Sequence, residues 1–244
     1  MKKNVVITGA NGGVGRALVE EMANKGCNVW ACVRKKTEEF ETFIGDIENK
    51  NSVWIKIVIL DLENDSSIKE AYKEISGCKE NIDVLINNAG VGHMALFQMT
   101  TIEEIRRIYD VNIISIMRLT QFILRNMIKQ KSGKIINISS TAAEEIYEGN
   151  AVYGATKAAL NIYTQALAAE VFKYGINVNA ISPGLIDTNM SMIFEGKNPE
   201  KPISHTALER KITPQEIADV VSWVIGEKTN IINGEIIHVT GGHK

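Results

Sequence analysis

The sequence predicts a single α/β domain in which a mostly parallel sheet of seven strands is doubly wound, with helices on both faces. Short runs rich in β-branched residues alternate with longer amphipathic runs along the 244 residues. Several short runs are apolar throughout, which is typical of parallel strands that are buried on both faces. A glycine-rich turn joins the first short run directly to the first amphipathic run.

Each element is predicted from its own pattern. The predicted strands are residues 4–8, 28–33, 55–60, 84–87, 134–139, 176–181 and 235–239. The predicted helices are residues 14–25, 66–75, 102–129, 152–174 and 214–225. Thr100 with Glu103 indicates a capping box before the third helix, and Thr213 with Pro214 indicates the start of the last. No repeat or linker divides residues 1–244, so one domain is expected.

Residues 189–212 depart from this alternation. They contain two prolines, one glycine, three lysines and only scattered apolar residues. A long irregular insert in a compact domain usually has a function. We interpret it as a flap over the substrate.

Composition excludes several classes of protein. A formal net charge of −2 predicts neither a nucleic-acid nor a membrane partner. Three cysteines without a CxxC pair favour a reducing compartment, and four widely spaced histidines predict no metal site. The N-terminal apolar run is too short for a signal peptide, and no run approaches the length of a membrane span. A cytoplasmic location is therefore expected.

The turn after the first strand reads Thr8-Gly9-Ala10-Asn11-Gly12-Gly13-Val14-Gly15. Glycines let the backbone approach a pyrophosphate, and the N-terminus of the following helix supplies N–H donors and partial positive charge. A plain glycine-rich turn is the alternative. The position directly between the first strand and first helix favours a dinucleotide, as in a Rossmann fold.

The spacing of Gly9, Gly13 and Gly15 resembles that of the short-chain dehydrogenase/reductase family, and further motifs extend the resemblance over nearly the whole chain. These motifs are Asn87-Asn88-Ala89-Gly90, Tyr153-Gly154-Ala155-Thr156-Lys157 and Asn179-Ala180-Ile181-Ser182-Pro183-Gly184. The resemblance implies an enzyme that interconverts a ketone and a secondary alcohol with NAD(P). Within the family the pattern is most similar to 3-oxoacyl-[acyl-carrier-protein] reductases, and it also resembles sugar, polyol and steroid dehydrogenases. The C-terminal strand is similar to a subunit-interface segment, which implies a homotetramer or homodimer.

Four residues are candidates for catalysis. Tyr153 and Lys157 are four residues apart, so a helix places them on one face. Ser140 follows the fifth strand, and strand alternation turns Ser139 the opposite way. The resemblance implies that Tyr153 is the acid/base, that Lys157 and the oxidised nicotinamide lower its pKa from about 10, and that Ser140 binds the carbonyl. It implies that Asn112, a poor residue for a helix interior, holds a relay water; an exposed asparagine is the alternative.

The cofactor preference is predicted from the end of the second strand. Arg34 follows Val33 there, and an arginine at this place accommodates a 2′-phosphate. NADP(H) is therefore expected, with NAD(H) as the alternative. A solvated Arg34 is the competing interpretation, and Gly12 stands where many NADP-preferring relatives carry a basic residue. The resemblance implies that these residues bind the cofactor: Gly9, Asn11, Gly13, Val14, Gly15, Arg34, Asp61, Leu62, Asn88, Ala89, Gly90, Tyr153, Lys157, Pro183, Gly184, Ile186 and Thr188.

Several alternatives stay open. Asp61 is either an adenine contact or a strand-end carboxylate, and the chain is either an enzyme or a non-catalytic NADP(H)-sensing or scaffold protein. Substrate contacts are expected from His93, Met94, residues 142–147 and the flap. Glu144 and Glu145 are expected to be solvated. If either points inward instead, an anionic thioester arm is disfavoured and a polyhydroxylated or amino-bearing substrate is favoured.

Overall fold

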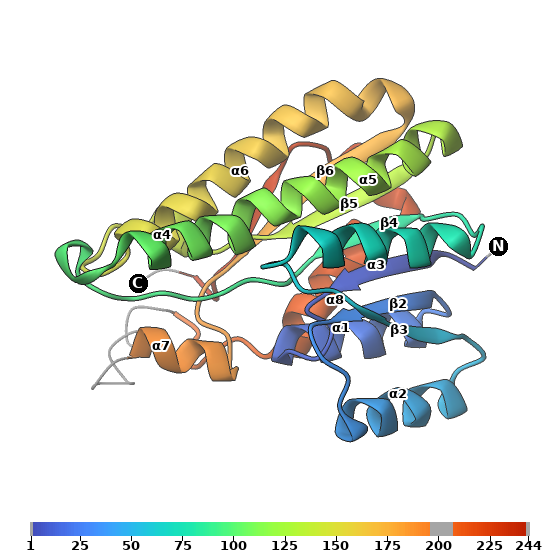
Figure 1. The fold of residues 1–244 in the computed structure, drawn as a ribbon, viewed down its shortest axis with the longest axis horizontal. Coiled ribbons are helices and arrows are strands. Elements are labelled where there is room, and N and C mark those ends of the chain that lie inside the picture. The colour runs from blue at the N-terminus through green and yellow to red at the C-terminus, as the bar shows by residue number, and fades with distance from the viewer. Residues whose placement is uncertain (1, 196–206, 243–244) are drawn as a thin grey trace.

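The computed structural model describes residues 2–195 and 207–242 of the chain. Its sheet contains seven parallel strands in the order β3-β2-β1-β4-β5-β6-β7, which confirms the predicted fold (Figure 1). The strands are β1 (Asn4–Thr8), β2 (Asn28–Val33), β3 (Ile55–Ile59), β4 (Val84–Asn87), β5 (Gly133–Ile138), β6 (Ile176–Pro183) and β7 (Ile236–Val239). The order reverses between β1 and β4, so a crevice is expected above their carboxyl ends.

Helices cover both faces of the sheet (Figure 1). One face is covered by α1 (Gly13–Asn24), α2 (Glu38–Lys50) and α8 (Pro214–Val224). The other face is covered by α3 (Asp65–Gly77), α5 (Ser115–Gln130) and α6 (Ala151–Val171). Each layer has its own buried cluster of apolar residues, because the strands between them are apolar on both sides.

Helix α2 was not predicted, although its sequence carries a signal. Phe40, Phe43, Ile44 and Ile47 recur at helical spacing and pack into the cluster under α1. The Thr37 side chain accepts a hydrogen bond from the Phe40 backbone N–H at 3.3 Å and caps the helix. The polar residues between these positions belong to its exposed face.

The chain is helical throughout the predicted range 102–129, but the structure corrects two details of that helix. It is divided into α4 (Ile102–Tyr109), a π-helical turn (Asp110–Ile114) and α5. The capping box is formed by Thr101 and Glu104, one residue later than expected. The physical reason is that the Thr100 hydroxyl donates to the Leu96 carbonyl at 3.2 Å and belongs to the preceding turn. Thr213 caps α8 and Pro214 is in its first turn, as predicted, and Thr213 also forms a capping box with Glu216.

The described parts of the predicted flap lie on either side of residues 196–206, which are outside the described residues. Asn189–Ser191 forms a 3₁₀ turn and Met192–Glu195 forms α7. Ile186 pairs with Ile212 in a parallel bridge, so the two ends of the insert meet. In the described ranges no helix combines the length and the apolar character that crossing a membrane requires.

Candidate active site

A cleft of about 1350 Å³ lies at the carboxyl ends of the strands. It is larger than a typical site for one small ligand, so it has room for a dinucleotide and a substrate. Of the residues predicted to bind or catalyse, these line it: Gly9, Asn11, Gly13, Val14, Gly15, Asn88, Ala89, Gly90, Ser140, Tyr153, Lys157, Pro183, Gly184, Ile186 and Thr188. The structure thus brings together segments from four strand ends.

The glycine turn is shaped for a close approach to the backbone. Gly9 has φ +64°, and a Cβ there would lie 2.9 Å from the Ala89 Cα. A Cβ on Gly15 would lie 2.1 Å from the Gly9 carbonyl oxygen, so no larger residue fits that turn. Gly12 caps α1 without a side-chain hydrogen bond, and the first turn of α1 contains no acidic residue. The helix N–H groups that face the cleft are therefore suited to hold a pyrophosphate.

Thr8, the last residue of β1, is hydrogen-bonded to the segment that follows β4. Its hydroxyl accepts hydrogen bonds from the backbone N–H groups of Asn88 at 3.0 Å and Ala89 at 2.9 Å. The Asn88 amide donates to the carbonyls of Thr8 and Gly9. Asn88 therefore contributes to the shape of the turn. Thr8 was missed in the sequence, although a polar residue ending a buried strand was a usable signal.

Tyr153, Lys157 and Ser140 converge in the cleft. Tyr153 and Lys157 come from one face of α6, and the Lys157 ammonium lies 5.8 Å from the centre of the Tyr153 ring. Lys157 Nζ donates to the Ile138 carbonyl at the end of β5, at 2.9 Å. Ser140 follows β5, and its side chain is near enough to Tyr153 to lower the pKa of the phenol in part. The Ser139 hydroxyl points elsewhere and donates to Asn161 Oδ1 at 2.6 Å.

Burial dominates the electrostatics of this group. Burial raises the pKa of the Tyr153 phenol to about 12, and the Ser140 side chain opposes that rise in part. Burial also lowers the pKa of the Lys157 ammonium to about 8. Lys157 was expected to help lower the pKa of Tyr153, but the residues around the phenol raise it. A second cation beside the phenol, such as an oxidised nicotinamide, would be needed to lower it.

Asn112 lies behind the cleft, inside the π-helical turn, and is fully buried. Its side chain accepts from the Val91 N–H at 2.9 Å and donates to the Val91 carbonyl at 3.0 Å. A Cβ on Gly90 would lie 3.2 Å from Asn112 Oδ1 and 3.7 Å from Lys157 Nζ. Asn112 and Lys157 are thus neighbours across Gly90. The exposed-asparagine alternative is wrong.

Three predicted cofactor residues do not line the cleft. Arg34 is exposed just after β2, and Leu62 is buried and borders a different hollow. One Asp61 carboxylate oxygen accepts from the Glu63 N–H at 3.0 Å, which matches the strand-end alternative for that residue. Arg16 was missed: its guanidinium binds Asn11 Oδ1 and pairs with Glu39 at 2.8 Å, which fixes Asn11 at the turn.

The segment after β6 closes the opposite wall. A Cβ on Gly13 would lie 2.7 Å from Thr188 Cγ2, so the segment that carries Thr188 contacts the glycine turn. Phe194 of α7 packs against Tyr153 with 5.1 Å between ring centres. Tyr153 is accordingly only 6% exposed. Phe194 lies in the predicted flap, but its contact with Tyr153 had no local signal in the sequence.

Among the residues flagged for substrate contact, Met94, Ala142, Glu145 and Tyr147 line the cleft. His93 and Glu144 do not line the cleft. The Glu144 carboxylate lies 3.1 Å from His238 Nε2 instead. Glu148 also lines the cleft and was not predicted.

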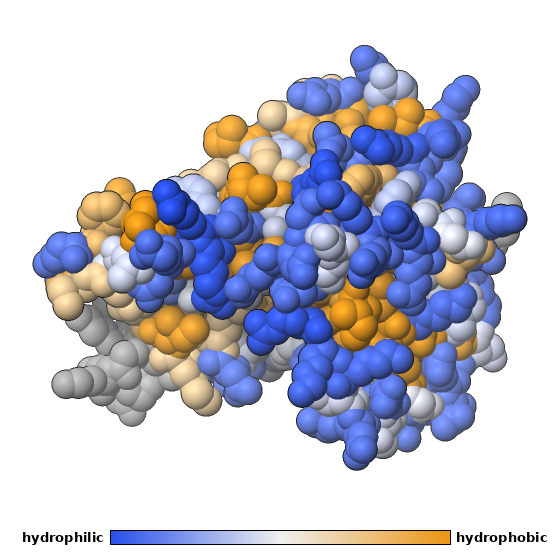
Figure 2. Space-filling view, in the orientation of Figure 1, coloured by the Kyte–Doolittle hydropathy of each residue, from blue (hydrophilic) through white to orange (hydrophobic). Residues whose placement is uncertain are grey.

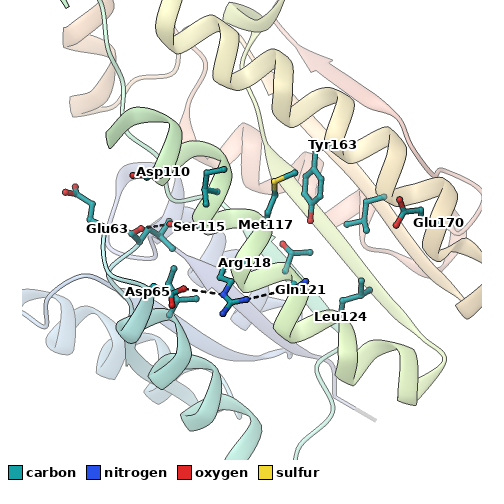
Figure 3. Close-up of a pocket in the computed structure, with 15 residues that line it drawn as sticks. Glu63, Asp65, Asp110, Ser115, Met117, Arg118, Gln121, Leu124, Tyr163 and Glu170 are labelled. Carbon is teal, nitrogen blue, oxygen red and sulfur yellow. Dashed lines mark hydrogen bonds and ion pairs between the residues drawn. The ribbon is translucent and has the colours of Figure 1, made fainter. Parts of the chain in front are cut away.

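A second hollow, of about 740 Å³, lies between α3, α5 and α6 (Figure 3). Tyr163 points into it from α6, and Arg118 bridges Asp65 and Gln121 at its other side. Burial raises the pKa of Tyr163 to about 12. Leu62 is the one predicted site residue that borders it, so the chemistry belongs to the first cleft.

Comparison with known proteins places this geometry in a family. The family model for short chain dehydrogenase matches residues 3–198. The 3-oxoacyl-[acyl-carrier-protein] reductase FabG of Aquifex aeolicus is 35% identical over 237 residues, covering 97% of this chain and 95% of that protein. The acetoacetyl-CoA reductase of Acinetobacter sp. is 30% identical over 241 residues, covering 99% and 97%.

Solved structures agree with this similarity. A dehydrogenase/reductase from Sinorhizobium meliloti is 27% identical with a TM-score of 0.91, covering 98% of this chain and 94% of that one. A protein from Beutenbergia cavernae, assigned as an NAD(P) dependent gluconate 5-dehydrogenase and containing NADP at low occupancy, is 25% identical with a TM-score of 0.91, covering 98% and 95%. The chain therefore belongs to the short-chain dehydrogenase/reductase family and is an oxidoreductase acting on CH–OH groups.

Proposed function

We propose that the chain interconverts a ketone and a secondary alcohol with NADP(H), and that Tyr153 is its acid/base. The observation that carries the proposal is the convergence of Tyr153, Ser140 and Lys157 at one end of a cleft whose other end is the glycine turn. The NADP bound to the Beutenbergia cavernae protein supports the cofactor class. A non-catalytic sensor would not need this convergence.

In the proposed mechanism each residue acts at a stated atom. The Ser140 hydroxyl and the Tyr153 phenol both hydrogen-bond the substrate carbonyl oxygen, and Tyr153 passes its proton to that oxygen as negative charge develops there. Lys157 favours the phenolate that results, and its protonated form would also hold the ribose hydroxyls of a bound cofactor. Asn112 holds a water that returns a proton towards Lys157. When bound, the reduced nicotinamide supplies the hydride.

The test is loss of nicotinamide absorbance with NADPH and NADH in parallel, using acetoacetyl thioesters and small aryl ketones as substrates. We expect NADPH to be consumed in preference to NADH. Tight NADPH binding without turnover of any carbonyl would instead support the sensing protein.

Arg34→Ala is expected to weaken NADPH binding about ten- to a hundredfold more than NADH binding, because the substitution removes a charge-assisted bond to the 2′-phosphate. Within the described residues Arg34 forms no ion pair, so its guanidinium is available. Lys36→Ala is the matched control, since Lys36 pairs with Glu41 at 3.8 Å. Fluorescence titration measures both dissociation constants. Equal losses for the two cofactors would show that Arg34 does not contact the phosphate.

We also propose a homodimer or homotetramer. Ile114, Met117 and Ile162 are exposed on the layer formed by α5 and α6, at 54%, 38% and 66%. Figure 2 shows hydrophobic residues reaching the surface over these helices between charged ones. Sedimentation should detect the assembly, and a monomer at every concentration would overturn it.

We further propose a cytoplasmic location, because Cys27, Cys32 and Cys78 are all free thiols.

A further inference from the structure

The inner wall of the substrate end of the cleft is apolar. The Phe194 ring is held between the Tyr153 ring and Gly92, where a Cβ would lie 3.1 Å from Phe194 Cε2 and Cζ. Met94 and Leu185 line the same cleft. A group bonded to the reacting carbonyl therefore meets aromatic and aliphatic side chains.

The outer rim is formed by the loop between Ser140 and α6, and its backbone is held in place. The buried Asn150 side chain donates to the carbonyls of Ala142 at 2.8 Å and Glu145 at 3.0 Å. A Cβ on Gly154 would lie 2.6 Å from the Ala142 carbonyl oxygen, so α6 packs directly on this loop. Glu145 is thus presented at the rim by a loop fixed to the catalytic helix.

The rim is acidic. Glu145 and Glu148 line the cleft, and neither forms a salt bridge with any other described residue. Among the described residues that line the cleft, Lys157 alone carries a basic side chain, and it lies beside Tyr153 rather than at the rim. Glu144 is directly adjacent in sequence but is turned to His238, outside the cleft. The pKa of Tyr147, which also lines the cleft, is raised mainly by burial and secondly by the negative charge of Glu145. The charge of Glu145 therefore acts on a group inside the cleft.

We propose that the substrate is a ketone with an apolar group beside its carbonyl and no anionic group at its far end, and that Phe194, Glu145 and Glu148 are specificity-determining residues. The proposal rests on the ketone reductase function proposed above. Acyl groups of a carrier protein or coenzyme A are attached to an arm that contains phosphate. Such an arm would leave the cleft past two carboxylates, neither of which forms a salt bridge within residues 2–195 and 207–242, and like charges repel.

Three aryl methyl ketones that differ only at the para position test the charge. They carry trimethylammonium, its uncharged isostere tert-butyl, or carboxylate. We expect kcat/KM for the cation to exceed that for the anion. Glu145→Gln combined with Glu148→Gln should reduce the cation-to-anion ratio about tenfold, the sum of two exposed charge interactions. Added salt should reduce the wild-type ratio in the same direction. Glu144→Gln is the matched control and should leave the ratio unchanged.

The outcomes separate the two proposals. Equal ratios in the wild type and the double variant, a preference for the anion, or reduction of acetoacetyl-CoA without reduction of any aryl ketone would overturn this inference alone. No NADPH oxidation with any of these compounds would overturn the proposed function instead.

Phe194→Ser should reduce kcat/KM for the tert-butyl ketone about three- to tenfold, because an aromatic contact to the substrate is lost. Met192→Ser is the control, since Met192 lies on the same short helix and is 67% exposed. An equal effect of the two substitutions would show that the Phe194 ring does not contact the substrate.

Discussion

Tyr153→Phe is expected to lower kcat by at least about a thousandfold while the dissociation constant for NADPH changes by less than about threefold. The substitution removes the hydroxyl that would give its proton to the developing alkoxide, and a positioned acid typically contributes about a hundred- to ten-thousandfold. The ring remains, so its packing against Phe194 is retained. Single-turnover kinetics with NADPH measures the chemical step separately from binding.

Tyr163→Phe provides the control for this prediction. Tyr163 lies on the same helix, and burial also raises its pKa to about 12, but it borders the second hollow rather than the cleft. We expect its kcat to stay close to that of the wild type. Substantial turnover by Tyr153→Phe would disprove the acid/base assignment.

Gly15→Ala is expected to abolish measurable NADPH binding and to lower the free energy of unfolding by about 1–3 kcal/mol. The new Cβ would lie 2.1 Å from the Gly9 carbonyl oxygen and 2.9 Å from the Ala10 Cα. Both are backbone atoms, so the turn itself has to shift, and overpacking of this kind costs about that much. Urea denaturation and NADPH fluorescence titration measure the two effects.

Gly12→Ala is the matched substitution in the same turn. Its Cβ would lie 3.4 Å from the Gly9 carbonyl oxygen, an ordinary contact, and Gly12 has an extended backbone with φ −76°. We expect it to retain NADPH binding and stability. If both variants behaved alike, the tight fit at Gly15 would not be the cause of the loss.

The sheet could be predicted from the sequence because each strand carries its own local pattern. All seven predicted runs are strands, since parallel strands buried on both faces are apolar along their length. The start of a helix was predicted less well where two neighbouring residues could each cap it. Thr100 and Thr101 each precede a glutamate by three residues, and only the bond from Thr100 to Leu96 decides between them. The π-helical turn depends on packing around Asn112 that adjacent residues do not encode.

The site residues also differ in whether a local sequence pattern or a long-range contact positions them. Tyr153, Lys157 and Ser140 could be placed because helical spacing and strand ends relate them locally. Phe194 contacts Tyr153 from 41 positions further along the chain, a long-range contact that no local pattern reports. Glu144 and Glu145 are chemically identical neighbours. The Glu144 carboxylate is bound by His238, 94 positions further along the chain, and no local pattern distinguishes it from Glu145.

The π-helical turn at Asp110–Ile114 makes the length of the chain at this point critical. The Ser115 N–H bonds to the Asp110 carbonyl five residues earlier, so the turn holds one residue more than an α-helix would. Each helical residue advances the direction of a side chain by about 100°. Deleting one residue between Asp110 and Ser115 would therefore convert the turn into regular α-helix and leave α4 and α5 in phase, but it would remove the extra residue of the turn that carries Asn112 opposite Val91. Deleting a second residue would rotate α5 by about 100° and turn Leu119 and Ile123 away from the core, although no side chain at the site had been altered.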